Sequence, residues 1–221
     1  DIPGATPTYG TVEAIPSPED YDNIQPTEKA KLVQRSKRQK SLNVEIPALL
    51  RQWDRDTELA HKFKDRAFYF AYFLDFRCRV YPRGNFHHHR NEPIKALFQF
   101  HKGKPLGPQG LKWLMVHVAN TGDFNKISKG LLEERLAWVA ENLSAIEDMV
   151  DDPENFRMWA EADSPFCFYA ACCDLVRALR SENIDEYVSH IPVALDGSNS
   201  GVQHYSAALR APEGKFVCLT D

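Results

Sequence analysis

The sequence has 221 residues, with 27 Lys and Arg against 31 Asp and Glu and a formal net charge of −4. This length allows one large domain or two small ones, and the charge excludes a global basic field, so any nucleic-acid contact has to come from local patches. Five cysteines, without a signal peptide or a long apolar span, fit a reducing, cytosol-like compartment better than a disulfide-stapled secreted protein.

Residues 1–26 contain five prolines and little apolar periodicity, which predicts a linker or lead-in. Thr27 is a suitable N-cap for a helix with a strongly basic run, typical of a solvated face but also of a surface that follows phosphates. Pro47 either kinks this helix or begins a second one. Apolar residues at helical spacing then predict a core-facing stripe: Ile46, Leu49, Leu50, Trp53, Ala60 and Phe63.

Residues 67–74 are aromatic on both faces, which favours the interior of a sheet. The next segment holds Asp75, Arg77, Arg79 and Tyr81. If it is extended, two arginines at period two point the same way and can grip successive phosphates. The alternative is a structural ion pair of Asp75 with either arginine.

The three histidines at 87–89 are adjacent, and adjacent side chains converge poorly on one metal ion, so we expect a polar loop. Residues 91–98 predict a short helix that carries Lys95. Residues 101–107 predict a turn with two lysines.

Three further helices follow. The first starts at Pro108 and ends at Asn120–Asp123, the second is capped by Ser128 with an apolar stripe from Leu132 to Val150, and the third opens at Ser164 and Pro165. The cysteines of the third helix fit no zinc spacing and are expected to be small core residues.

Residues 191–210 are the most informative stretch. Ile191, Val193 and Leu195 predict a short strand, a Gly-rich turn follows, and Ser200 begins a capped helix. Asp196 therefore stands at a strand-to-helix corner, where a carboxylate either hydrogen-bonds the turn or holds a hard cation such as Mg²⁺.

A strand, a Gly-rich corner and a helix are also the setting of a hydrolase nucleophile elbow. Here Asn199 takes the middle position, and Ser198 and Ser200 are each displaced by one residue. The turn is not a phosphate-binding P-loop either, because no Gly-Lys-Ser/Thr follows.

Four motifs in order resemble those of the single-subunit DNA-directed RNA polymerases, the family of bacteriophage, mitochondrial and chloroplast-type enzymes. They are Asp75–Tyr81 (DFRCRVY), Lys102–Gly107 (KGKPLG), Asp163–Phe168 (DSPFCF) and Asp196–Tyr205 (DGSNSGVQHY). The resemblance covers residues 27–221. It implies a partial right-hand polymerase fold of α+β class, mostly helical with a small antiparallel palm sheet.

By this resemblance, residues 27–66 are a helical, thumb-like segment and residues 67–221 the N-terminal part of the palm. Asp196 and Gly197 would be ligands of two catalytic Mg²⁺ ions, with Asp196 the catalytic carboxylate. The nucleic-acid contacts would be made by Asp75, Arg77, Arg79, Tyr81 and Lys95, and the helix behind the metal site would carry Gln203 and His204.

The implied reaction is nucleotidyl transfer from NTPs to an RNA 3′-hydroxyl on a DNA template, which depends on positioning and on charge neutralisation by two ions. The implied partners are DNA template, RNA product, NTPs and the remainder of the polymerase chain, without a membrane. The family's second Asp and its fingers residues would come after residue 221, so we expect the chain alone to be inactive.

Two positions depart from the family pattern. Cys78 stands where the family usually has Gly, and residues 87–90 replace an Asn-Pro-Gln-Gly-like loop.

A non-catalytic nucleic-acid-binding relative and a hydrolase with a displaced serine remain the alternatives. The compartment would be the host cytoplasm for a phage enzyme or the mitochondrion for an organellar one.

Overall fold

The computed structural model describes residues 24–194 and 200–210. Within these ranges the chain is mostly helical and has two antiparallel sheets of two strands each, which confirms the α+β expectation in its coarse form. The chain divides into two compact units between Arg90 and Asn91. We call them the first and the second unit.

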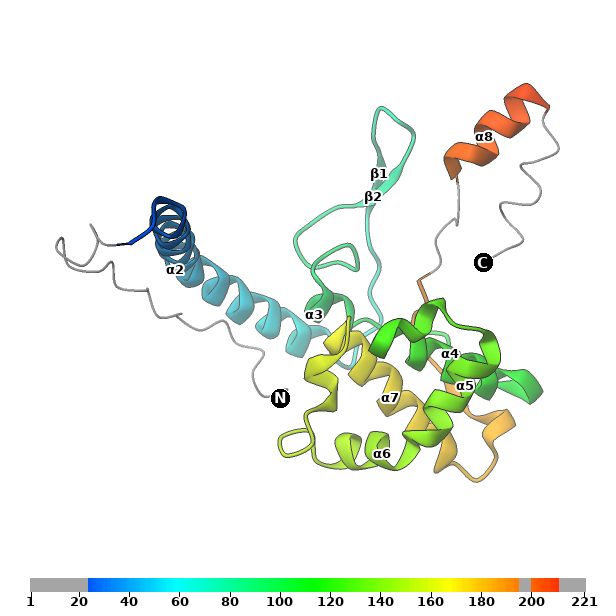
Figure 1. Ribbon diagram of the computed structural model, residues 1–221. Coiled ribbons are helices and arrows are strands. Elements are labelled where there is room, and N and C mark those ends of the chain that lie inside the picture. Colours follow the sequence, from blue (N-terminus) through cyan, green and yellow to red (C-terminus); the bar gives the residue numbers. More distant parts are fainter. Residues whose placement is uncertain (1–23, 195–199, 211–221) are drawn as a thin grey trace. The chain divides into compact units, whose positions relative to one another are not determined.

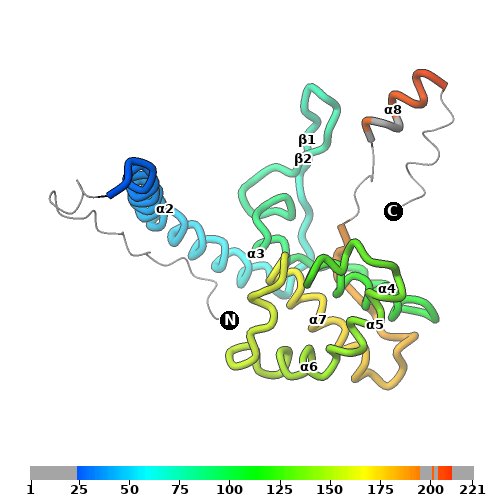
Figure 2. Tube along the Cα trace, in the orientation of Figure 1, coloured from blue at the N-terminus to red at the C-terminus, as the bar shows by residue number. Residues whose placement is uncertain are grey.

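The first unit begins with helix α2, Pro26–Phe63. Gln25 is its N-cap and Pro26 its first residue, where a missing N–H costs nothing, so the prediction of a Thr27 cap is wrong. The helix runs through Pro47 without ending, and Figure 2 traces it as one continuous coil.

The apolar stripe of α2 is less buried than expected. Ile46 is 6% exposed, but Leu49 is 46% exposed, so the expected core packing holds for the first of these residues and fails for the second. Apolar periodicity predicts which face of a helix is hydrophobic, but this face is buried only where other residues pack against it. The described residues supply such packing only locally.

A hairpin follows α2. Strand β1, Tyr72–Leu74, pairs antiparallel with β2, Val80–Pro82, with Phe73 opposite Tyr81. The expected sheet interior is wrong, because Tyr69 is 92% exposed and Leu74 65%. A two-stranded ribbon has no neighbouring strands or facing layer among the described residues, so its aromatic side chains stay at the surface.

The second unit contains most of the elements (Figure 1). Its α-helices are α3 Glu92–Lys95, α4 Gly107–Gly122, α5 Leu132–Glu141, α6 Leu143–Asp151, α7 Pro165–Leu179 and α8 Ser200–Leu209. Its 3₁₀ helices are η1 Phe124–Lys129, η2 Met158–Glu161 and η3 Ile184–Glu186, and its strands are β3 Lys104–Pro105 and β4 Val188–Ser189. The short helix with Lys95 and the helices that start near Pro108 and Pro165 are confirmed.

Helix α7 is the centre of the second unit, and α3, α4 and α6 pack against it. Phe168 and Leu175 of α7 are fully buried, as are Val118 of α4 and Ile146 of α6. The Phe168 ring meets Phe124 edge-on, with 5.6 Å between the ring centroids. A core built on one apolar helix explains why α7 tolerates few polar residues.

The helix predicted from a Ser128 cap is instead two helices. Ser128 lies in η1, where its backbone N–H donates to Asp123 Oδ1 at 2.9 Å, and the N-cap of the next helix is Leu131. Helix α5 begins at Leu132 and stops before Asn142, whose side-chain amide donates to the Trp138 carbonyl at 2.7 Å. A local side-chain bond of this kind competes with helix continuation.

The strand expected at residues 191–195 is also misplaced. Strand β4 lies at Val188–Ser189 and pairs with β3 inside the predicted 101–107 turn, with Lys104 opposite Ser189. Residues 191–194 have no strand structure, and Leu195 lies outside the described residues. Pro192 lacks the N–H that a ladder needs, which ends the pairing before this stretch.

Candidate nucleic-acid interface

The tip of the β1–β2 hairpin is organised by one carboxylate. Asp75 Oδ1 accepts the backbone N–H of Arg77 at 2.8 Å and that of Arg79 at 3.0 Å. The Asp75 N–H in turn donates to the Arg79 carbonyl at 3.0 Å. These bonds fold residues 75–79 into a tight turn rather than the extended segment expected from the sequence.

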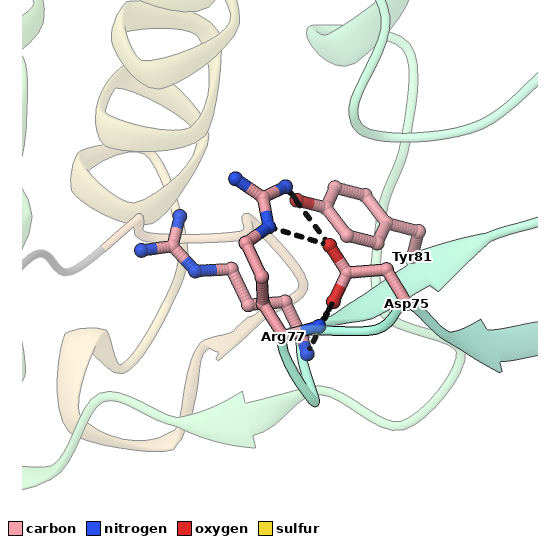
Figure 3. A network of polar contacts seen from close by, with 4 residues as sticks. Asp75, Arg77 and Tyr81 are labelled. Atoms are coloured by element: carbon pink, nitrogen blue, oxygen red, sulfur yellow. Dashed lines mark hydrogen bonds and ion pairs between the residues drawn. The ribbon is translucent and has the colours of Figure 1, made fainter.

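The other oxygen of Asp75 holds the Arg77 side chain (Figure 3). Arg77 Nε donates to Asp75 Oδ2 at 2.9 Å, and its Nη2 lies 2.9 Å from the same oxygen and donates to the Tyr81 hydroxyl at 3.0 Å. Of the two alternatives, the structure therefore has the ion pair, and its partner is Arg77. Three residues expected at the interface are brought together in one network.

This network lowers the pKa of Asp75. The largest cause is the hydrogen bond from the Arg79 backbone, followed among the favourable ones by the Arg77 side chain and backbone. Hydrogen bonds to the charged form favour ionisation. Asp75 is thus held as an anion whose two oxygens are both occupied by this turn.

Arg79 differs from Arg77 in what its side chain does. Its backbone N–H serves the turn, but its guanidinium makes no hydrogen bond or ion pair with any residue that the structure describes. The side chain is exposed. A guanidinium presented in this way is available for bidentate binding of an external phosphate.

Cys78 sits between the two arginines with φ of +58°. This left-handed conformation favours glycine, because a Cβ crowds the following carbonyl oxygen there. The departure from the family's Gly therefore falls where the backbone most needs one. Cys78 still adopts the turn, held by its own N–H to the Asp75 carbonyl at 3.0 Å.

Exposed aromatic rings lie in the turn, at Phe76, and beside it, at Phe73. Phe76 is 93% exposed, and the Arg77 guanidinium carbon lies 5.4 Å from the centroid of its ring. Arg83 stands at the same distance over Phe73. Aromatic faces beside cations suit stacking of nucleic-acid bases next to bound phosphates.

The histidine loop is polar, as expected. The His88 and His89 rings meet edge-on with centroids 4.7 Å apart, and the His89 backbone N–H donates to His87 Nδ1 at 3.1 Å. In the parts of the chain that the structure describes, no three His, Cys, Asp or Glu side chains group as a metal site would. Nor does any described helix have the length and apolarity to cross a membrane.

The remaining predicted site residues belong to the second unit. Lys95 is exposed in the last turn of α3, and His204 is exposed on α8. Gln203 lies in α8, but its side chain is not among those described. Asp196 and Gly197 lie outside the described residues, so their role as metal ligands stays a prediction.

Two buried acids escaped the sequence reading. Asp56 of α2 is 5% exposed and lies 2.8 Å from Arg90 Nη2, and Arg90 also donates to the Asn85 carbonyl. Asp174 of α7 is 7% exposed and accepts bonds from two hydroxyls. For Asp174 a signal existed, since it is the one acid in a mostly apolar helix whose other charged residue is Arg177.

Comparison with known proteins gives a consistent result. Residues 104–219 match the family model described as DNA-dependent RNA polymerase. The chain is 43% identical over 152 residues to the mitochondrial DNA-directed RNA polymerase of Schizosaccharomyces pombe, which covers 68% of this chain and 13% of that protein.

Similar relatives occur in animals and plants. Over 158 residues, covering 71% of this chain and 13% of the relative, the identity to the human mitochondrial DNA-directed RNA polymerase is 39%. Over 199 residues, covering 87% of this chain and 20% of the relative, the identity to chloroplastic DNA-directed RNA polymerase 3 of Nicotiana sylvestris is 35%. The chain thus spans a small part of the length of the relatives it matches.

Proposed function

The chain belongs to the single-subunit, phage-type family of DNA-directed RNA polymerases, and we propose that it contributes a nucleic-acid-gripping hairpin and one metal-binding carboxylate to such an enzyme. The observation that carries the proposal is the hairpin turn at residues 75–79. There one carboxylate organises the backbone so that an exposed guanidinium faces outward.

Within this turn the roles divide. Asp75 is a positioning residue, because both of its oxygens are already taken by the turn and by Arg77. Arg79 is the phosphate-binding residue, and Arg77 is held against Tyr81 as part of the frame. The proposed ligand is the backbone of the template–product hybrid, read without sequence specificity.

Lys95 is proposed to bind a phosphate of the nucleic-acid backbone. Its side chain is exposed, and a lysine at the end of α3 is a point charge suited to a phosphate. In domain terms we assign residues 1–26 to a linker, 27–66 to a thumb-like segment and 67–221 to the first part of a right-hand palm.

Asp196 and Gly197 are the proposed Mg²⁺ ligands. A carboxylate and a backbone carbonyl are both hard oxygen donors, the type that Mg²⁺ prefers, so the donor set fits the ion. When bound, two such ions would neutralise charge on the triphosphate and the 3′-hydroxyl. Helix α8, which starts at Ser200, would support these two ligands, with Gln203 and His204 on it.

The whole reaction requires more than these residues supply. The chain spans 13% of the Schizosaccharomyces pombe relative and 20% of the Nicotiana sylvestris relative. A two-metal site also needs a second carboxylate. We therefore propose that RNA synthesis occurs in the longer polymerase and that this chain alone is inactive. The relatives' names place them in mitochondria and chloroplasts, which favours an organellar over a cytoplasmic location.

The decisive experiment uses a full-length polymerase that carries this chain with Asp196→Asn. RNA extension on an assembled hybrid should be lost while hybrid affinity, measured by fluorescence anisotropy, is retained. Asp151→Asn is the matched control, because that carboxylate pairs with Arg180 at the surface. Undiminished extension by Asp196→Asn would reject the metal role. A wild-type protein that binds the hybrid without extending it would identify a non-catalytic relative.

A further inference from the structure

The second unit contains a buried carboxylate with no place in the interface described above. Asp174, on α7, accepts a hydrogen bond from the Tyr187 hydroxyl at 2.8 Å and another from Ser189 Oγ at 2.5 Å. The second distance lies in the range of bonds between a hydroxyl and a charged oxygen. Both oxygens of the carboxylate are therefore directed at a single three-residue segment.

This arrangement follows from strand geometry. Residues two apart in an extended segment project to the same side, so Tyr187 and Ser189 reach α7 together. Asp174 is 7% exposed, and a buried carboxylate is tolerated only when its oxygens are satisfied. The Tyr187 and Ser189 hydroxyls satisfy the two oxygens of Asp174, and these hydrogen bonds fix the positions of both side chains.

The other side of the same segment is held by the β3 region. The Leu106 N–H donates to the Tyr187 carbonyl at 2.9 Å, and the Phe100 N–H donates to the His190 carbonyl at 2.9 Å. His190 Nδ1 lies 2.7 Å from the Phe100 carbonyl oxygen. Residues 187–190, which we call the anchored segment, are thus bonded on both sides.

Packing leaves this segment little freedom to shift. A Cβ added at Gly103 would lie 2.6 Å from the Ser189 carbonyl oxygen and 2.8 Å from His190 Cδ2. Such distances are shorter than van der Waals contact, so only glycine allows β3 to approach this closely. The anchored segment is therefore held by hydrogen bonds on both sides and, on the side of β3, by close contact with Gly103 as well.

The anchored segment ends six residues before Asp196, and residues 191–194 between them form no helix or strand. We propose that Asp174 is a positioning residue that fixes the anchored segment and, through it, the approach of the chain to Asp196. This proposal rests on the proposed function of Asp196. It adds a residue on another helix, which touches neither nucleic acid nor metal, to the set that controls nucleotide addition.

The test has a structural and a kinetic part, both in the full-length polymerase. Hydrogen exchange by mass spectrometry, without nucleic acid or metal, reports whether peptides covering residues 187–194 are protected. Asp174→Ala should lower this protection, while Asp151→Ala, which removes a surface carboxylate paired with Arg180, should not. In extension assays, Asp174→Ala should slow the maximal rate of nucleotide addition by about tenfold to a hundredfold, with hybrid affinity unchanged.

Two further variants separate positioning from general loss of fold. Asp174→Asn keeps one oxygen that can accept a hydrogen bond and adds an amide N–H that can donate to the Ser189 hydroxyl oxygen. Its rate of nucleotide addition should therefore be much closer to wild type than that of Asp174→Ala. Gly103→Ala displaces the anchored segment from its other side without a change of charge, so it should reproduce the slow rate. If Asp174→Ala does not fold, Gly103→Ala still tests whether displacing the anchored segment slows nucleotide addition.

Unchanged protection of residues 187–194 in Asp174→Ala would overturn the proposal. So would lost protection with a normal rate of nucleotide addition, because the anchored segment would then not control the reaction. The exchange measurement is independent of Asp196. If Asp196→Asn remains active while Asp174→Ala loses protection, it is the metal assignment that fails and not the anchoring.

Discussion

Arg79 and Arg77 should contribute very differently to hybrid binding, although they are two residues apart. The Arg79 guanidinium is free of partners among the described residues, whereas that of Arg77 is bonded to Asp75 and Tyr81. A free guanidinium that neutralises a phosphate releases a counterion, while one already paired with a carboxylate releases less. The variants Arg79→Ala and Arg77→Ala test this difference.

The magnitude follows from counterion release. Each phosphate neutralised adds about 0.9 to the slope of log K against log salt for a duplex. Raising salt from about 50 mM to about 200 mM therefore weakens binding by about 3.5-fold for each such contact. Arg79→Ala should lose one full contact of this kind, and Arg77→Ala clearly less.

Fluorescence anisotropy titrations of a labelled RNA–DNA hybrid at four or five salt concentrations measure the slopes. Arg79→Lys is the control, since it keeps the charge but not the bidentate geometry, and it should retain the wild-type slope with weaker binding. Equal slopes for wild type and Arg79→Ala would refute the reasoning. A larger change in Arg77→Ala than in Arg79→Ala would refute the division of roles.

Three further predictions concern the stability of the two units. Asp56→Ala removes the carboxylate partner of Arg90, whose side chain is 17% exposed, and should reduce the stability of the first unit by about 1–3 kcal/mol, seen as faster hydrogen exchange in α2. Asp56→Leu with Arg90→Met should recover most of this stability, and failure to do so would point to a role beyond the ion pair. Phe168→Ala empties a fully buried site and should destabilise the second unit by about 3–5 kcal/mol, measured by urea unfolding, with a loss below about 1 kcal/mol contradicting the packing. Burial lowers the pKa of His117, so below about pH 6.5 the unfolded chain binds a proton at this residue while the folded chain does not. The free energy of unfolding should therefore fall as the pH drops below about 6.5, and His117→Gln should reduce this dependence of stability on pH.

The helices that sequence reasoning found were those with local signals. Helices α4 and α7 each combine a proline in the first turn with apolar residues at helical spacing, and these features act within a few residues. The break at Asn142 escaped because the apolar spacing continues across it. At Asn142 the backbone leaves helical geometry, with φ −98° and ψ 7°, and its side-chain amide donates to the Trp138 carbonyl.

Burial was harder to predict than secondary structure. The aromatic run before Asp75 does form part of a hairpin, but the expected covering layers are missing among the described residues, so Tyr69 is exposed. Composition states what a surface prefers and not what covers it. The same limit explains why the α2 stripe is buried at Ile46 and exposed at Leu49.

The nucleic-acid role of Asp75, Arg77 and Tyr81 stays a prediction, and the structure shows only how these residues are arranged with one another. The sequence indicated Asp75, Arg77 and Tyr81, but it did not decide which arginine pairs with Asp75. The turn at Cys78 could not be predicted, because no glycine marks it. The comparison with the family pattern marked that position as unusual. Asp174 was visible as the one acid of α7, but its partners could not be predicted, because they are 13 and 15 residues away.

Helix α2 has a mechanical property that its sequence position determines. Pro47 has no N–H to donate to the carbonyl four residues earlier, so the 38-residue rod contains one weakened turn near its middle. From Pro47 to Pro26 the helix measures about 32 Å, so each degree of bending at that turn moves the far end by about 0.5 Å. A small bend at Pro47 would therefore displace the basic first half of α2, and most of all its Pro26 end.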